Sequence, residues 1–473
     1  MMATALTVLI AAATVIAALN WRAGFMACIL VGFAQEPLRK LQPMQPVWFQ
    51  IIVGLTFAAM VLGIFLNGPQ MRMRFLYSGD TQLGTAWRMF VVVVILQALH
   101  TLVRYDSPIL LVLGLVFYLT PILAMIAAIL FARTQRDIER LLRAYLVLAV
   151  PAALTVYLSY FYGDSPPLLQ EVGAFVGRPL IIYQFGTGFY SHSGIMRVGE
   201  TAAWHAAAAV AFLVMLALIR DRPATRIVAG ILVAVLIGAI MLTGRRKMLA
   251  TLAIFFATYW MLLAWLGQVA HRRIVTTALI AMVIFFLFLG FQGDEGGQGE
   301  LYVRRGASVV DEIQDRVTTA VDLMRAALWS QGVLGAGAGV SAHGAQFFGG
   351  GWQIEGADES GLGKIAGELG VPGLLAIAFL LYRLAHYVRN LLRYVARVDR
   401  KLTMIACGLV SFVVGNAFAF AAATQLFGDP FVLLMLGWCM GFVLATPKLV
   451  AYRQASGYRP QPVMGGGNRV LAL

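Results

Sequence analysis

Apolar residues occur in long runs along most of this chain, and polar residues gather in the short stretches between the runs. A run of roughly 18 to 25 apolar residues is long enough to cross the hydrocarbon core of a bilayer as a helix. Helices suit that environment because they satisfy their own backbone hydrogen bonds. The runs lie near 3–19, 23–34, 47–66, 86–103, 109–132, 141–161, 201–219, 227–243, 248–267, 274–291, 371–387, 402–422 and 427–445.

This pattern predicts an all-α, polytopic membrane helix bundle of about 12–13 transmembrane helices with a long extracytoplasmic loop. The run at 23–34 is short and could be re-entrant, so the count depends on it. The first run lacks a preceding basic stretch and another run follows it at once, so we expect a retained helix and not a signal peptide. We divide the chain into transmembrane helices over 1–291 with an outer loop at 162–200, a long outer loop at 292–370, C-terminal transmembrane helices at 371–446 and a cytoplasmic tail at 447–473.

Composition agrees with a membrane protein, because 60% of the residues are hydrophobic and the mean hydropathy is +0.81. Lys and Arg number 36 against 22 Asp and Glu, which gives a formal charge of +14. In a soluble protein such a balance would suggest nucleic acid. Here the basic residues fill loops between apolar runs, as expected for cytoplasmic loops, so we expect no nucleic-acid partner.

Orientation follows from the basic C-terminal tail, which the positive-inside rule places in the cytoplasm. Counting backwards from the tail, the basic stretches at 389–401, 271–273, 220–226 and 133–143 fall on the cytoplasmic side. The segments 162–200, 244–247 and 292–370 then lie outside. Nearer the N-terminus, basic pairs occur in successive loops, so the orientation of that part stays open: Arg39 with Lys40, and Arg72 with Arg74.

The turn at 244–247 carries three consecutive cations on the predicted outer face: Arg245, Arg246 and Lys247. Cations are sparse on that face, so a compensating anion is expected there. The alternative is a tolerated exception to a statistical rule.

The long outer segment at 292–370 has room for a site, because loops of this length are usually functional or disordered. Apolar residues recur at helical spacing over 309–329 and predict an amphipathic helix carrying Arg316, which points either to solvent or to a cavity. The Gly-rich stretch 332–339 lacks the lysine of a phosphate loop and favours a turn where helices approach closely. His343 is a candidate base or an ordinary surface residue.

The three cysteines lie inside apolar runs and show no metal-binding spacing: Cys28, Cys407 and Cys439. We therefore expect them to be packing residues, and we expect neither a metal ion nor a cofactor.

Three short motifs together resemble the O-antigen ligase and polymerase superfamily of bacterial envelopes. They are Thr243-Gly244-Arg245-Arg246, then Glu359-Ser360-Gly361-Leu362, then Glu368-Leu369-Gly370-Val371-Pro372, with an arginine-bearing helix and a Gly-rich turn between the first and second. The resemblance covers roughly 194–375. The stretch at 33–43 is similar to one in exopolysaccharide members of that group.

The resemblance implies a glycosyltransferase in the bacterial cytoplasmic (inner) membrane, active on its extracytoplasmic face. It would transfer glycan from a polyprenyl-diphosphate-linked donor to an acceptor hydroxyl without a nucleotide sugar or metal, alongside membrane lipid and a chain-length regulator or other assembly proteins. Arginine suits a diphosphate because its planar fork binds two phosphate oxygens. The resemblance assigns diphosphate binding to Arg246, Arg316 and Arg197, with Arg245 and Lys247 beside them.

An acceptor hydroxyl needs a base, and ligases of this superfamily place a histidine nine residues before the glutamate of the Glu-Leu-Gly element. This chain has Glu359 there, which favours the polymerases over the ligases. Asp358 stands beside it, and a pair of carboxylates could hold one proton near neutral pH, although two exposed acids titrate normally. Glu368 is either catalytic or a structural partner at the start of the next helix.

Two alternatives to a polymerase of lipid-linked repeat units remain. One is a ligase that transfers glycan to a lipid acceptor. The other is a secondary transporter or polysaccharide export component without chemistry. Transporters commonly place ionisable residues and broken helices in the middle of the membrane, within two related halves. The sequence instead gathers its acids and arginines in the outer loops, and it shows no internal repeat.

Overall fold

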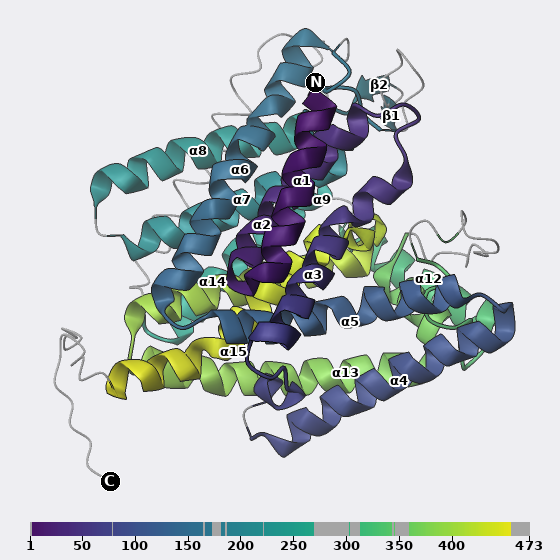
Figure 1. Ribbon diagram of the computed structural model, residues 1–473, viewed down its shortest axis with the longest axis vertical. Helices are drawn as coiled ribbons and strands as arrows, with labels where there is room; N and C mark the ends of the chain where they lie inside the picture. The colour runs from purple at the N-terminus through teal and green to yellow at the C-terminus, as the bar shows by residue number, and fades with distance from the viewer. Residues whose placement is uncertain are drawn as a thin grey trace.

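The computed structural model describes residues 2–77, 79–163, 166–172, 181–184, 187–220, 222–268, 302, 313–342, 345 and 359–455. Within these ranges the chain is helical apart from connecting segments and one small hairpin (Figure 1). In the hairpin, strand β1 (Ile181–Gln184) pairs antiparallel with β2 (Thr187–Tyr190), and Ile181 lies opposite Tyr190.

Thirteen α-helices lie in the described residues, and eleven helical segments are long and apolar enough to cross a membrane. The predicted all-α, polytopic bundle is therefore confirmed, while the predicted run 274–291 lies outside the described residues. The two helices that do not meet the criterion are α2 and α12. The helices are α1 (Met2–Leu19), α2 (Trp21–Lys40), α3 (Ile52–Asn67), α4 (Thr81–Tyr105), α5 (Pro108–Phe131), α6 (Gln135–Tyr162), α7 (Gly199–Ile219), α8 (Pro223–Leu242), α9 (Lys247–Trp265), α12 (Ile313–Gln331), α13 (Gly361–Ala396), α14 (Arg400–Ala422) and α15 (Pro430–Ala455), with short 3-10 helices η1 (Val47–Ile51), η2 (Met73–Leu76) and η4 (Gln425–Gly428).

Helix α2 is one continuous helix and not a short re-entrant segment. It begins after Asn20, whose side chain accepts hydrogen bonds from the Arg22 and Ala23 amides, and it continues six residues beyond the apolar run at 23–34. Its polar last turns, including Glu36, Arg39 and Lys40, are buried inside the bundle. The helix can extend past the apolar run because partners within the bundle satisfy these side chains.

Close contact between helices shapes the bundle. Helix α7 is its centre, since 83% of its apolar window is buried, against 17% for α1 at the periphery. Helices α5 and α15 approach closely because Gly437 and Gly441 lie on one face of α15, against the backbone of Pro121 and Met125. Small residues four apart allow such contact in membrane proteins, where dispersion and not water exclusion holds helices together.

The contacts between connecting segments divide them into two groups, at opposite ends of the membrane-spanning helices. We call one the hairpin end, formed by β1, β2 and the turn between α8 and α9, where Ser191 Oγ donates to the Thr243 carbonyl. We call the other the basic end. There, Arg453 of α15 pairs with Asp399 before α14 and donates to Gln135 at the start of α6. In the described residues, the segments predicted outside lie at the hairpin end and those predicted cytoplasmic lie at the basic end.

The structure also assigns the two N-terminal basic pairs to ends. Lys40 lies at the hairpin end, where its ammonium group donates to Ser193 Oγ and the Gly194 carbonyl. Helix α3 ends against the end of α1 near Ala18, so Arg72 and Arg74 follow at the basic end. Gln268 lies at the basic end, where its carbonyl accepts from Arg400, and Tyr302 lies at the hairpin end, where its hydroxyl donates to the Tyr190 carbonyl.

Helix α13 consists of two helical segments joined at Gly370, whose φ of 62° is left-handed. The second segment, 371–396, has 26 residues and is about 39 Å long, enough to span a bilayer by itself. The first segment therefore lies at the hairpin end of the membrane-spanning part. The outer loop was predicted to end at Gly370, which is the position of this break.

The Gly-rich turn 332–339 fills the break in α13. The amides of Ala336 and Gly337 donate to the carbonyls of Gly367 and Glu368, and the Val371 amide donates to the Val333 carbonyl. These bonds satisfy backbone groups that the break would otherwise leave unpaired. The predicted role of this stretch, a turn where backbones approach closely, is confirmed.

Candidate functional site

A buried ion cluster around Arg197 anchors the hairpin end. Its guanidinium group pairs with Glu36 of α2 at 3.1 Å and with Asp429, which precedes α15, at 2.8 Å. The Glu36 carboxylate also accepts from the Arg197 amide at 2.8 Å. Burial alone would lower the pKa of Arg197, but Asp429 and Glu36 raise it above its usual value. Protein carboxylates thus hold this guanidinium group, and the cluster joins the segment before α7 to α2 and to the start of α15.

The cationic turn between α8 and α9 lies at the rim of this cluster. Arg245 approaches Glu171 at 4.0 Å, and Lys247 pairs with Glu200 of α7. Burial lowers the pKa of Arg245, and Glu171 opposes that effect. All three cations of the turn are partly exposed, with Arg246 at the N-cap position of α9. The turn therefore presents positive charge to its surroundings while two carboxylates behind it hold its conformation.

Glu359 lies at the same end, immediately before α13, and its side chain is exposed. The next residue, Ser360, is buried; its hydroxyl caps α13 by accepting from the Gly363 amide and donates to the Ala421 carbonyl at the end of α14. Among the described acidic side chains of the hairpin end, Glu359 and Asp106 are exposed and have no ion pair in the described residues. Glu359 therefore presents its carboxylate at the surface of the hairpin end.

The packing of α9 against α14 brings Glu359 and the cationic turn to one place. These helices run antiparallel, and Gly415 of α14 lies against the Thr251 carbonyl of α9. From this contact α9 leads back by one turn to Lys247, and α14 leads forward by less than two turns to Ala421, which Ser360 contacts. The cations therefore lie at the start of α9, and Glu359 lies beside the end of its partner α14, at the same end of the bundle.

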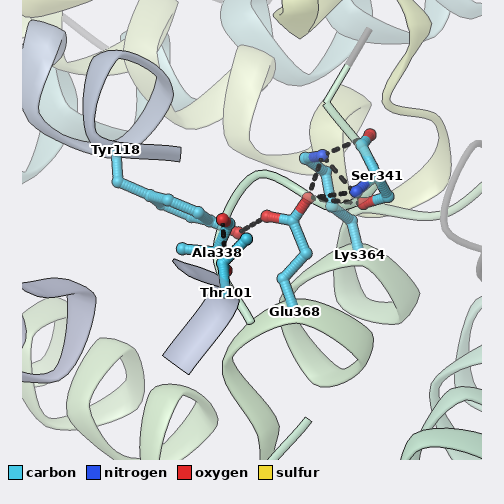
Figure 2. Close-up of polar contacts among 6 residues, drawn as sticks. All are labelled: Thr101, Tyr118, Ala338, Ser341, Lys364 and Glu368. Carbon is cyan, nitrogen blue, oxygen red and sulfur yellow. Dashed lines mark hydrogen bonds and ion pairs between the residues drawn. The ribbon is translucent and has the colours of Figure 1, made fainter. Parts of the chain in front are cut away.

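A second buried network surrounds Glu368 in the first segment of α13 (Figure 2). Its carboxylate accepts from Tyr118 Oη at 2.7 Å, from Ser341 Oγ at 2.6 Å, from the Ser341 amide at 2.9 Å and from Lys364 Nζ at 2.9 Å. Three of these donors bond to Oε1, and Tyr118 bonds to Oε2. Glu368 therefore joins α5, Ser341 just after the Gly-rich turn, and α13.

The remaining predicted residues lie between 309 and 358. Part of the segment predicted as an amphipathic helix, 309–329, lies in α12, which packs on α13 through Met324, Ala327 and Leu328, while 309–312 lie outside the described residues. Arg316 lies in α12, but its side chain, like His343 and Asp358, is outside the described residues.

Sequence reasoning missed the partners that hold the site. Glu36 and Lys40 lie at the end of an apolar run, while Glu171 and Asp429 lie in short polar connections. A signal existed for Glu36, since ionisable residues that continue an apolar helix are usually paired inside the bundle. The residue that pairs with it, Arg197, lies 161 positions away, and only the fold brings the two together.

No known protein family, curated protein or solved structure matches the chain.

Proposed function

We propose that this protein is a glycosyltransferase that polymerises polyprenyl-diphosphate-linked glycan repeat units at the hairpin end, on the extracytoplasmic side of a bacterial cytoplasmic membrane. One observation carries the proposal: the cationic turn 245–247 begins α9, and the exposed Glu359 lies next to Ser360, which contacts the end of α14, the helix packed against α9. The turn lies opposite the basic end, where a membrane protein normally gathers its cations.

The two groups have complementary tasks in such a transfer. An acceptor hydroxyl attacks the anomeric carbon, its proton passes to Glu359, and the bond from that carbon to the diphosphate oxygen breaks. The leaving diphosphate takes the bonding electrons and gains negative charge. Arg246, with Arg245 and Lys247, stabilises that charge, since guanidinium groups bind phosphate oxygens in pairs.

The test uses purified protein, a lipid-linked donor and measurement of polymer length and donor binding. We expect Glu359→Gln to lower polymerisation about 10²–10⁴-fold with donor binding kept, as for loss of a general base. Asp106→Asn is the matched control, because Asp106 is an exposed carboxylate at the same end. Unchanged polymerisation by Glu359→Gln would remove the carboxylate from the mechanism, and loss of binding together with turnover would make it structural.

The arginine is tested in the same preparation. Lysine cannot reproduce the bidentate fork, so Arg246→Lys should weaken donor binding and polymerisation. Arg325→Lys on α12 is the control, because Arg325 is exposed and pairs only with Asp322 of its own helix in the described residues. Wild-type polymer from Arg246→Lys would refute the diphosphate assignment. A single glycan transferred to a lipid acceptor, with no chain growth, would identify the ligase alternative.

Orientation is tested independently by cysteine labelling in intact cells. The three native cysteines are buried, so background reaction should be small. A cysteine at Lys247 should react with an impermeant reagent from outside, whereas one at Arg140, at the basic end, should react only after the membrane is opened. The reverse result would contradict the proposed face.

The structure gives one specific observation in favour of a transporter instead. Helix α13 is broken at Gly370, and the buried pair Lys364–Glu368 lies directly before the break. Transporters build substrate sites from such broken helices and buried charges. Here the Gly-rich turn satisfies the broken backbone and donors of the protein bond to both oxygens of Glu368, so glycosyl transfer remains the first proposal. Movement of lipid-linked glycan across vesicles without a new glycosidic bond would reverse this order.

A further inference from the structure

A cavity of about 870 Å³ opens at the basic end, far from the proposed glycan site. It lies between the first turn of α6, the connection of α7 to α8, the start of α14 and the last turns of α15. Its volume lies within the usual range for sites that bind small molecules, roughly 300–1,000 Å³. Six cations line it: Arg133, Arg136, Arg220, Arg222, Lys401 and Arg453.

The two carboxylates in the cavity wall are already neutralised by the protein. Asp399 pairs with Arg453 and accepts from the Leu402 amide at 3.0 Å as the N-cap of α14. Glu139 pairs with Arg143 on its own helix and accepts from Gln135 Nε2 at 2.8 Å. Neither carboxylate is left to balance the other cations.

The five cations other than Arg453 have no ion pair among the described residues, which do not include Asp221. Like charges that face one cavity repel each other, and a bound anion removes that repulsion. The first turn of α6 also faces the cavity, and the amino end of a helix favours negative charge. Arginine predominates among the five, and its fork matches phosphate oxygens better than an ammonium group does.

We propose that this cavity binds a phosphate-bearing anion. Two sources share that chemistry: the headgroup of an anionic phospholipid and a soluble phosphorylated molecule. The lining also includes Ile219, Leu402 and Leu449, at the ends of membrane-spanning helices. These apolar residues place the cavity at headgroup level, where basic pockets between helices bind phospholipid headgroups. The inference is independent of the proposed glycosyl transfer.

The test compares two variants with the same change in net charge. The cavity variant is Arg136→Gln, Arg220→Gln and Arg222→Gln. The control variant removes three exposed arginines near the same end that do not line the cavity: Arg140, Arg389 and Arg397. Each purified protein in neutral detergent is titrated with short-chain phosphatidylglycerol, short-chain phosphatidylcholine or inorganic phosphate, and the unfolding temperature is recorded.

We expect phosphatidylglycerol to raise the unfolding temperature with saturation and phosphatidylcholine to have little effect. The apparent Kd for phosphatidylglycerol should weaken at least about tenfold in the cavity variant and less than about twofold in the control. Inorganic phosphate could replace the lipid as the ligand. A saturating rise of the unfolding temperature with phosphate, weakened in the cavity variant and not in the control, would also support the site and would indicate a soluble ligand.

Equal weakening in both variants would overturn the proposal, because general surface charge would then explain the effect. Absence of saturation with both phosphate-bearing probes would also overturn it. If the cavity variant does not fold, Arg136→Gln against Arg140→Gln gives the same comparison within α6.

Discussion

Removing the ammonium group of Lys364 should destabilise the protein strongly, because Glu368 would keep a buried charge without its cation. The Lys364 side chain is 4% exposed and that of Glu368 is fully buried, with 2.9 Å between Nζ and Oε1. Lys364 also donates to the carbonyl and the hydroxyl of Ser341. The variant Lys364→Met keeps the length of the side chain and removes all three bonds.

The magnitude follows from what remains around the carboxylate. Breaking a buried ion pair by removing one partner typically costs about 3–5 kcal/mol. Tyr118 and Ser341 still donate to Glu368, so we expect the lower end, about 3 kcal/mol. Adding Glu368→Gln removes the stranded charge, and the double variant should therefore be less destabilised than the sum of the single variants, with a coupling of about 1–3 kcal/mol.

Unfolding of the purified protein in mixed micelles, followed by circular dichroism, measures these differences. Arg325→Met is the control, because the Arg325–Asp322 pair on α12 is exposed and should contribute less than about 0.5 kcal/mol. A loss below about 1 kcal/mol in Lys364→Met, or additive effects of the two substitutions, would refute the interpretation of this network as the joint between α5, the Gly-rich turn and α13.

Three further outcomes follow from the structure. Arg197→Met should lower stability by about 3–5 kcal/mol, because two buried carboxylates lose their cation. The loss should be seen as less monodisperse protein in size-exclusion chromatography. An equal loss in Arg197→Lys would show that the geometry of the guanidinium fork, and not positive charge alone, holds the cluster. Burial lowers the pKa of His192 to about 4, against about 6.5 in the unfolded chain. The contribution of neutral His192 to the free energy of unfolding is therefore complete above pH 6.5 and declines by at most about 3 kcal/mol as the pH falls towards 4. His192→Gln should flatten that part of the pH–stability curve, and an unchanged curve would contradict the assignment. Gly337→Ala should destabilise by at least about 1–3 kcal/mol, because φ is 110° and a Cβ would lie 2.3 Å from Thr101 Oγ1, whereas Gly230→Ala meets open space in a helix and should be neutral or stabilising.

The membrane-spanning framework was predictable because it depends on local sequence. A run of apolar residues long enough to cross hydrocarbon forms a helix whatever its neighbours are. The alternation of basic loops likewise predicted which segments lie together at the basic end. Helix α2 was harder to predict, since its last turns carry ionisable residues that are stable only where Arg197 and the segment at 193–194 meet them.

The candidate site was predictable in part. Cations in the turn 245–247 were recognisable because they interrupt the expected charge pattern, and Glu359 was found through a motif. Their shared position at the end of α9 and α14 was not, because it depends on the contact of Gly415 with Thr251. Sequence reasoning also left two roles open for Glu368, and its four donors from three segments decide for a structural one.

The sequence alone therefore determined that the chain spans a membrane, which segments share an end of the bundle, and where a phosphate-binding turn is expected. These properties follow from hydrophobic length and charge, which act residue by residue along the chain. The tertiary structure alone decided which charges are neutralised and which remain available. Arg197 is held by Glu36 and Asp429, whereas the cations of the basic-end cavity have no such pairs in the described residues. Pairing acts over a few ångströms, and residues far apart in sequence reach that distance only when helices pack.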